Sequence, residues 1–539
     1  MQQGTARIVS FHQLVHNAIE DALGPSLAGF LPELAICATI VALLLAEIVS
    51  PGRRKVALCV MLSGSAAALY LAAPWDYLGE GGAGVLLFTG MTAFDSLSVY
   101  LRSLLLLFNV LFTLFVWSTG FPEQENAAEF CVLVSGAALG MCLMISASHM
   151  MIVFLGVEMA SVPSYALAGM LKYRRESSEA ALKFAVFGGA SAGVMLYGIS
   201  LLVGVLGSAH LPTMAAQLAR LLDDPAAADR YAVVALGGLM VIVGLAFKLS
   251  AVPFHFWAPD VFEGATAEVG AFLSVASKVA ALGLLVRLAV GLGCAVPQQY
   301  VAALEPARAY LTGLIALLAA VTCSFGNLAA YGQGNMKRLL AYSTIAHAGY
   351  MMMPVAAATA LAQASPNAAR QAVASLAFYA AVYLFMNLGA FAVVAYLRNA
   401  LGSEEIADYA GLARRSPGLA VCFALILFSL VGLPPLAGFS AKFSIFAALV
   451  NWPAGKVDIR LLALLIVGAL NTFLSLFYYL RVVRVMALWD EPQHRRAPSV
   501  PMLSVPGVAC LALTAPLLVL FVFSDGLMSW AMAAASKLF

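Results

Sequence analysis

Residues 244–265 read GLAFKLSAVPFHFWAPDVFEGA, and they continue an uninterrupted apolar run, YAVVALGGLMVIV, at residues 231–243. Lys248 stands where this run should cross a lipid bilayer, and Pro253 and His255 follow it closely. A proline inside a helix removes a backbone hydrogen bond and breaks or kinks the helix. Backbone groups freed at membrane depth are tolerated only where protein buries them or a watery cavity surrounds them. The stretch therefore predicts a broken transmembrane helix that carries a buried charge.

The composition points to the same environment. The chain has 539 residues, of which 63% are apolar and 10% are charged, whereas a soluble protein carries about 25% charged residues. We therefore expect an all-α integral membrane protein that contacts the lipid bilayer. The formal net charge of +2 argues against a nucleic-acid partner. The polar start, MQQGTARIVSFHQ, lacks the early apolar region of a cleaved signal peptide.

The chain offers no visible site for a cofactor or a metal. Its eight cysteines include no C-x-x-C pair, and nearly all lie in apolar runs. Zinc and iron–sulfur sites need clustered thiolates, so we interpret these cysteines as small hydrophobic residues. No G-x-G-x-x-G motif follows a plausible strand, which argues against a nucleotide site. We expect no cofactor and no metal within this chain.

Apolar runs long enough to span a bilayer recur along the whole chain. A spanning helix needs about 20 mostly apolar residues. By that measure we predict fourteen spans, at about 27–49, 55–75, 95–118, 128–147, 149–171, 178–206, 231–259, 266–292, 308–328, 337–359, 370–397, 418–450, 461–488 and 501–534. Basic residues number fifteen in one set of loops, which includes Arg53, Lys337, Arg338 and Arg481, and eight in the other. Because cytoplasmic loops are enriched in lysine and arginine, we expect both termini on the outer face.

Two of these spans are too long for one straight helix. The seventh, at 1.5 Å per residue, would measure about 44 Å, and the twelfth, which contains GLPPLAG, is longer still. Because the two broken helices stand five apart, the second crosses the bilayer in the opposite sense. Inverted repeats with paired broken helices are typical of transporters. We therefore predict four regions: helices 1–3 at 1–127, a first repeat (helices 4–8) at 128–293, an inverted second repeat (helices 9–13) at 294–490, and a C-terminal helix at 491–539.

Five charged residues inside the predicted spans are candidates for function. They are Glu158 in helix 5, Lys183 early in helix 6, Lys278 midway through helix 8, and Lys248 and Lys442 beside the two breaks. A charged residue near the bilayer centre costs about 2.5–3.5 kcal/mol on insertion scales. A passive scaffold has no need of such groups, so we expect pairing or proton exchange to reduce this cost.

Glu158 and Lys248 are the expected pair. Burial disfavours the charged form of a lysine, and a nearby carboxylate favours it. Movement of Glu158 relative to Lys248 would therefore switch the lysine between holding and releasing a proton. Lysine suits this role because its charge can be lost on burial, whereas arginine stays charged. The pattern predicts a proton relay at mid-membrane, with His255 in the break as a secondary candidate.

Several of these polar residues also have ordinary structural explanations. Lys183 could extend its ammonium group to the membrane interface. His255 and His347 could be core histidines with satisfied hydrogen bonds. Interface, subunit-contact or helix-packing roles are expected for Arg102, Arg287 and Glu33.

The same residues carry a resemblance to a known family. The stretches that carry it are VEMASVPSYALAGM at 157–170, SSEAALKFAVFGGASAGVMLYGISLLVG at 177–204, FKLSAVPFHFWAPDVFEGA at 247–265, GNMKRLLAYSTIAHAGYMMM at 334–353 and GLPPLAGFSAKF at 432–443. Together they resemble the antiporter-like subunits of respiratory complex I, a quinone-reducing NADH oxidoreductase. The resemblance covers roughly residues 90–490.

This resemblance implies roles for individual residues. Glu158 looks like the helix-5 glutamate and Lys248 like the helix-7 lysine paired with it, while Lys183 matches a helix-6 lysine near the glutamate. The other matches are Lys278 as the connecting lysine of helix 8, His347 as the helix-10 histidine between two half-channels, and Lys442 as the helix-12 lysine. One departure is Thr266, with Glu268 nearby, where the family often has proline after EGA. It puts the start of helix 8 in question, though not Lys278.

The resemblance also implies a function and an assembly. It predicts a proton-translocating subunit of NADH:quinone oxidoreductase, in a bacterial inner membrane, beside other membrane subunits that include further antiporter-like ones. FMN, iron–sulfur clusters and quinone would then belong to partner subunits. Two alternatives are a subunit of a related cation/proton antiporter or membrane-bound hydrogenase, and a structural membrane anchor without a transport role.

Overall fold

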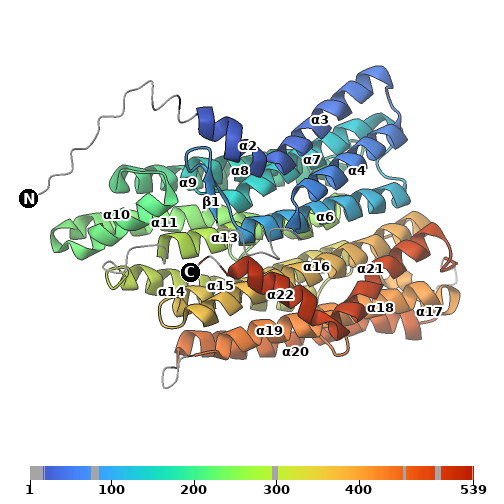
Figure 1. The fold of residues 1–539 in the computed structure, drawn as a ribbon. Coiled ribbons are helices and arrows are strands. Elements are labelled where there is room, and N and C mark those ends of the chain that lie inside the picture. The colour runs from blue at the N-terminus through green and yellow to red at the C-terminus, as the bar shows by residue number, and fades with distance from the viewer. Residues whose placement is uncertain are drawn as a thin grey trace, which may run out of the picture.

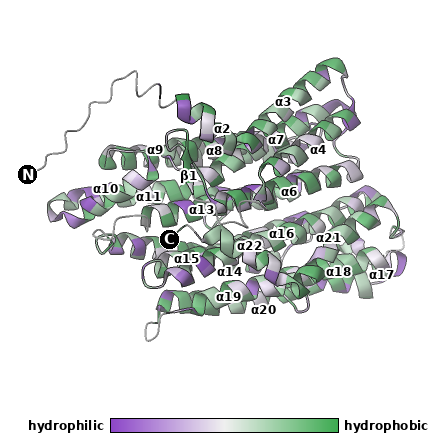
Figure 2. Ribbon diagram, in the orientation of Figure 1, coloured by the Kyte–Doolittle hydropathy of each residue, from purple (hydrophilic) through white to green (hydrophobic). Residues whose placement is uncertain are grey.

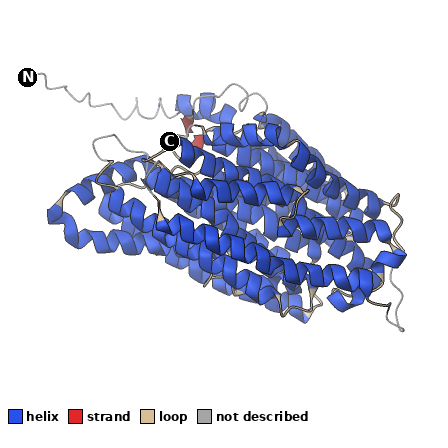
Figure 3. Cartoon of the chain, turned by 90° about the horizontal axis from the view of Figure 1, so that it is seen from below, coloured by secondary structure: helices blue, strands red, loops and turns tan. Residues whose placement is uncertain are grey.

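The computed structural model describes residue 16, residues 19–74, 84–293, 301–452, 457–491 and 499–536, and residue 538. The polar start of the chain, Cys294 and some of the counted loop residues, Arg7 among them, lie outside these ranges. Within them the chain is almost entirely helical (Figure 3). One short antiparallel pair joins β1 (Val85–Leu87) to β2 (Thr92–Phe94), with Val85 opposite Phe94.

The helices form two tiers of roughly parallel rods (Figure 1). The first tier, blue to green, contains α2 (Leu27–Gly29), α3 (Leu31–Val49), α4 (Arg54–Leu71), α6 (Ser96–Thr119), α7 (Ala127–Ser146), α8 (Met150–Ala168), α9 (Arg175–Leu206), α10 (Leu211–Asp223), α11 (Ala228–Leu249), α12 (Trp257–Gly264) and α13 (Ala267–Gly293). The second tier, yellow to red, contains α14 (Glu305–Ala330), α15 (Met336–Leu361), α16 (Pro366–Leu401), α17 (Leu412–Arg415), α18 (Pro417–Val431), α19 (Ala437–Val450), α20 (Ile459–Leu488), α21 (Val505–Val522) and α22 (Ser524–Ala535).

The fold is that of a polytopic membrane protein. Within the described residues, twelve helices are long and apolar enough to cross a bilayer. Apolar residues cover the lengths of the rods, and polar ones gather at places such as α10 and α17, at opposite ends of the bundle (Figure 2). Because a bilayer core cannot satisfy free backbone groups, helices that bond internally are what a chain of this composition must form.

The twelve helices fall short of the fourteen predicted spans for identifiable reasons. The twelfth predicted span is divided into α18 and α19, which are apolar but too short to cross alone. The tenth span corresponds to α15, which is not among the twelve. The last predicted span is also divided, because α21 ends at Val522 and α22 begins at Ser524.

Two long helices, α13 and α16, form the centre of the bundle. The most apolar stretch of α13 is fully buried and that of α16 is 94% buried. Arg398 near the end of α16 reaches Glu268 in the first turn of α13 at 3.1 Å, and the Glu268 side chain is fully buried. This ion pair joins the two tiers.

Two further buried ion pairs fix the periphery. Arg102 of α6 lies 3.0 Å from Glu33 of α3, and both side chains are nearly inaccessible. Arg287 of α13 binds the Asp95 carboxylate through two nitrogens, at 2.7 and 2.9 Å. Since Asp95 also caps α6, these arginines hold helices together, and their contacts match a helix-packing role.

Candidate functional site

The first helix break frees a backbone carbonyl inside the bundle. α11 ends at Leu249, because Pro253, four residues on, has no N–H to donate to the Leu249 carbonyl. The amide of Val252, which would otherwise bond the Lys248 carbonyl, donates instead to the hydroxyl oxygen of Thr322 in α14 at 3.0 Å. The break thus leaves the Lys248 carbonyl available to another donor.

Two buried lysines meet at this break. Lys278 Nζ, from α13, donates to the Lys248 carbonyl oxygen at 3.1 Å and to Ser250 Oγ at 2.6 Å. Lys248 Nζ points the other way and donates to Ser161 Oγ of α8 at 3.0 Å. Lys248 is 3% exposed and Lys278 is fully buried. Both ammonium groups are therefore hydrogen-bonded to neutral oxygen atoms and not to carboxylates.

Glu158 lies near this pair without bonding it directly. It is half-buried on α8, one turn before Ser161, and no ion pair within 4.0 Å joins its carboxylate to Lys248. The Lys248 ammonium group instead meets α8 at Ser161. The two charges still interact electrostatically, and the Ser161 hydroxyl that receives Lys248 donates in turn to the Val157 carbonyl at 2.6 Å.

Lys183 binds two carboxylates other than Glu158. Its ammonium group forms ion pairs with Glu179 at 2.8 Å and with Asp260 of α12 at 2.7 Å, and its side chain is 38% exposed. Asp260 also forms an ion pair with Arg338 of α15 at 2.8 Å. Burial alone would raise the pKa of the Asp260 carboxyl, but hydrogen bonds from Lys183 and Arg338, together with their charges, hold that pKa below its usual range. Lys183 thus belongs to a charged cluster at the end of the bundle.

The second break repeats the first in different residues. α18 ends at Val431, whose carbonyl has no intrahelical donor because Pro435 stands four residues on. Lys442 Nζ of α19 donates to this carbonyl at 2.9 Å and lies 4.4 Å from the Tyr350 ring centroid, a cation–π distance. Gly432 has a φ of 88°, and a Cβ on it would come within 2.9 Å of Lys442 Cδ. The glycine allows the lysine to lie against the break.

His347 is the centre of a buried hydroxyl network. Its Nδ1 lies 2.6 Å from Tyr379 Oη of α16, and its Nε2 lies 3.5 Å from Tyr479 Oη of α20. Tyr479 Oη is also 2.5 Å from Ser343 Oγ. The sequence interpretation missed these partners. A usable signal exists on α16, where polar residues recur every four positions, at Ser375, Tyr379, Tyr383 and Asn387.

His255 packs against aromatic side chains. Its ring lies 4.4 Å, centroid to centroid, from Phe325 in an edge-on arrangement, and 4.9 Å from Phe256. No hydrogen bond joins the described His255 to Lys248 or Lys278. The geometry therefore places it beside the break but outside the lysine contacts.

Lys337 is a buried cation that the sequence interpretation placed in a loop. Its side chain is fully buried, forms an ion pair with Glu404 at 2.8 Å and donates to the Ala265 carbonyl at 2.6 Å. Ala265 is one of the two residues between α12 and α13. Lys337 stands in the first turn of α15, where a positive charge opposes the helix dipole. That conflict is a signal for an acidic partner.

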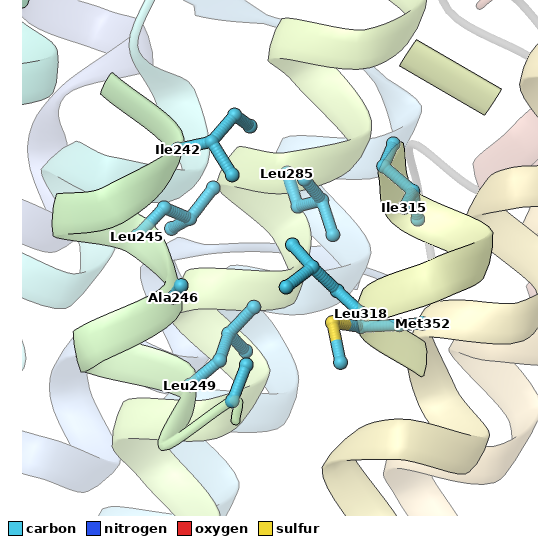
Figure 4. Close-up of a pocket in the computed structure, with 9 residues that line it drawn as sticks. Ile242, Leu245, Ala246, Leu249, Leu285, Ile315, Leu318 and Met352 are labelled. Atoms are coloured by element: carbon cyan, nitrogen blue, oxygen red, sulfur yellow. The ribbon is translucent and has the colours of Figure 1, made fainter. Parts of the chain in front are cut away.

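A small apolar cavity lies beside the first break, among α11, α13, α14 and α15 (Figure 4). It touches Leu249 and Ala251 at the first break and Met352, five residues after His347. Its volume of about 10 Å³ is at the lower limit for one water, and apolar walls favour a dry space. The complete lining is Ile242, Leu245, Ala246, Leu249, Ala251, Leu285, Ile315, Leu318 and Met352. No direct hydrogen bond joins the described Lys278 to His347.

Comparison with known proteins places this arrangement in a family. Residues 147–469 match the family described as NADH:quinone oxidoreductase/Mrp antiporter, TM. A relative from Sorangium cellulosum, named NADH-quinone oxidoreductase subunit N 2, is 39% identical over 507 residues, which cover 92% of this chain and 95% of the relative. A chain from respiratory complex I of Thermus thermophilus has a TM-score of 0.69 and 29% identity, with 92% of this chain and 98% of that chain covered.

A chain of the Mrp complex from Dietzia sp. is similar in fold, with a TM-score of 0.74 over 95% of this chain and 98% of that chain. At 19% identity this similarity shows the shared fold alone. The matched family, the 39% identity over nearly the whole length and the pair of lysine-bearing helix breaks agree with one another. The chain belongs to the NADH-quinone oxidoreductase subunit N family, the proton-translocating membrane subunits of respiratory complex I.

Proposed function

We propose that this subunit carries protons across a bacterial inner membrane through Glu158, Lys248, Lys278, His347 and Lys442, coupled to quinone reduction in partner subunits. The observation that supports this most is the pair of breaks. At each, a buried lysine ammonium group binds a backbone carbonyl that the helix break leaves without a helical donor. Burying a cation without a carboxylate at bonding distance costs free energy, and a group that can release its proton avoids that cost.

The geometry supports a role for charge repulsion at the first break. Lys278 binds the backbone carbonyl of Lys248, and both side chains are buried, so a proton on one lysine disfavours a proton on the other by charge repulsion. The carboxylate of Glu158, three residues before Ser161 on α8, favours the charged form of Lys248 by attraction between opposite charges. A shift of α8 would change that influence. Lys248 then keeps its proton when Glu158 is near and passes it toward Lys278 when the carboxylate withdraws.

The orientation follows from the distribution of basic residues. The end of the bundle that carries Arg338, Arg481 and α17 is richer in lysine and arginine, so in this proposal it faces the cytoplasm, and both termini face outward. Lys183, with Asp260, lies at this end, where protons would enter. Regions 128–293 and 294–490 are the two inverted repeats of the proposal, with the second opening to the outer face.

The assembly follows from what the chain holds. Electron transfer needs FMN, iron–sulfur clusters and quinone, and the proposal assigns these to partner subunits, with no cofactor in this chain. Other membrane subunits, including further antiporter-like ones, would contact it within the bilayer. Coupling to NADH oxidation then depends on those contacts.

The test is Lys248→Ala in the assembled complex, reconstituted in vesicles. We expect both NADH-driven quinone reduction and proton pumping to fall, by about 10²-fold if every proton passes through Lys248, since a positioned proton-transfer group contributes that much or more. Lys172→Ala, at an exposed ion pair with Glu129, is the matched control and should leave both rates unchanged. Wild-type protons pumped per electron in a fully assembled Lys248→Ala complex would remove Lys248 from the relay.

A further inference from the structure

Trp257 is a buried tryptophan that the relay described above does not use. It is the first residue of α12 and follows the first helix break. Its neighbours come from three other helices and include Phe184 of α9, Phe247 of α11 and Lys278 of α13. Trp257 therefore contacts both of the helices that carry the lysines of the first break.

Contacts with α9 and α11 fix the orientation of the indole ring. The ring stacks on Phe184, with centroids 4.2 Å apart and planes 10° apart, and its centroid lies 5.3 Å from that of Phe247. The indole N–H donates to the Phe247 carbonyl at 3.1 Å. Because Phe247 directly precedes Lys248, Trp257 is bonded to the end of the helix that carries this lysine.

The ammonium group of Lys278 lies over this ring. Its nitrogen is 5.0 Å from the ring centroid, within the range of about 6 Å for a cation–π interaction. The face of an aromatic ring carries partial negative charge, and tryptophan attracts a cation more strongly than the other aromatic side chains do. The same nitrogen donates to the Lys248 carbonyl and to Ser250 Oγ. Two neutral oxygens and one ring face thus lie against the ammonium group.

The second break has the same arrangement, with a tyrosine in place of the tryptophan. The Lys442 nitrogen, which donates to the Val431 carbonyl, lies 4.4 Å from the centroid of the Tyr350 ring. This ring is also buried, and its hydroxyl lies 3.1 Å from Thr472 Oγ1, which fixes its orientation. In the described part of the chain, the two lysines that bind a carbonyl at a break are also the two lysines that lie over an aromatic ring. Packing alone does not require this match.

We propose that Trp257 is a positioning residue of the relay, whose ring stabilises the protonated form of Lys278 as Tyr350 does for Lys442. The inference rests on the proposed proton-carrying role of these lysines. Lys248 repels a proton on Lys278, and the two oxygens that bind Lys278 carry no charge to offset this repulsion. A ring face lowers the free energy of the charged lysine and, unlike a carboxylate, cannot take the proton from it. Lys278 can then accept a proton and later release it.

The test changes the charge distribution of the ring and keeps its shape. Tryptophans with an increasing number of fluorine atoms replace Trp257 in the assembled complex, by suppression of a stop codon. Each fluorine withdraws electrons from the ring face and adds little volume. The measurement is NADH-driven proton pumping in vesicles that hold equal amounts of complex. We expect the pumping rate to fall with each added fluorine, by on the order of tenfold over the series.

The matched control places the same fluorinated residues at Trp530 of α22. Among the described residues, no cation lies over the ring of Trp530. The pumping rate should therefore stay constant in the control series. Trp257→Leu removes both the ring face and the packing, so it does not separate the two roles, whereas the fluorinated series does.

The outcomes separate this inference from the relay itself. If the pumping rate stays constant or rises along the Trp257 series while Lys278→Ala loses pumping, the ring only packs and the relay stands. If Lys278→Ala pumps normally, the role of this lysine fails and that of Trp257 fails with it. Equal losses at Trp257 and Trp530 would also overturn the proposal, because fluorine would then act without a cation. A graded loss at Trp257 with a constant rate at Trp530 supports it.

Discussion

The ammonium nitrogen of Lys278 lies 3.1 Å from the carbonyl oxygen of Lys248, the carbonyl whose usual helical donor, Val252, is turned away to Thr322. The side chain of one lysine therefore takes the place of a backbone amide of the helix that carries the other. A change in the charge on Lys278 must alter the stability of the break beside Lys248. Proton transfer and helix geometry are coupled at this one contact.

Lys278→Ala should consequently disturb Lys248 as well as remove a relay group. We expect a large loss of pumping and a smaller one in Ser250→Ala, because the serine supplies only one of the two oxygens that bind Lys278. Pumping rates of the two variants, measured in vesicles with equal amounts of assembled complex, provide the comparison. Equal losses in both would show that the carbonyl contact contributes nothing.

Glu158→Gln and Ser161→Ala should act on the same target, Lys248. Their combined effect should be smaller than the sum of the separate effects, since residues that act on one shared partner depart from additivity by about 0.5–3 kcal/mol. A double-mutant cycle on the pumping rate measures this coupling. Additive effects would mean that Glu158 influences Lys248 by a route that does not involve Ser161.

Lys442→Arg tests whether this lysine changes its charge. Arginine keeps its proton at any working pH, so we expect pumping to be lost, whereas Lys442→Glu should retain part of the activity because a buried carboxyl can also carry a proton. The measurement is NADH-driven acidification of vesicles. Full activity in Lys442→Arg, with normal assembly, would show that Lys442 does not titrate.

Lys337→Met should impair assembly more than catalysis. It leaves Glu404 without its buried partner, and breaking a buried ion pair costs about 3–5 kcal/mol. The double variant Lys337→Met, Glu404→Gln should be milder, because no lone charge remains. The fraction of assembled complex on native gels is the measurement, and exposed Lys55→Met is the control. A normal yield for the single variant would contradict the buried pair.

Asp260→Asn should lower stability in a pH-dependent way. The pKa of this carboxyl lies below its ordinary value of 3.8, so its ion pairs stabilise the folded state above that pH and are lost as the pH falls through the lowered pKa. Because the groups are partly exposed, the loss at pH 7 should be about 1 kcal/mol or less. Thermal melting of the complex at pH 7 and near pH 3 should differ less in the variant than in the wild type. Exposed Asp223→Asn should show no such change.

Helix positions could be predicted from the sequence because a bilayer sets their length. The predicted spans 95–118 and 128–147 agree closely with α6 (Ser96–Thr119) and α7 (Ala127–Ser146). The proline-containing stretches also indicated where α11 and α18 end. These features depend on local composition and on backbone chemistry, which the sequence states directly.

Side-chain partners depended on rotation of the helices, which composition does not encode. A small rotation of α8 about its own axis decides whether Lys248 meets Glu158 or Ser161. Lys183 pairs with Asp260, which is 77 positions away in the sequence. The course of the chain brings the two together, and hydrophobic periodicity does not specify that course. The sequence interpretation counts Lys337 among the loop residues, although tertiary contacts bury it completely.

The ion pair between Arg398 and Glu268 has a consequence for biosynthesis. The two residues are 130 positions apart, and at about 5–20 residues per second Glu268 is made about 7–26 s before Arg398. During that interval Glu268 on α13 has no Arg398 to pair with. Placing an unpaired acidic group in lipid costs free energy on the order of kilocalories per mole. The nascent α13 therefore has to remain beside the insertion machinery, in contact with water or protein, until α16 emerges.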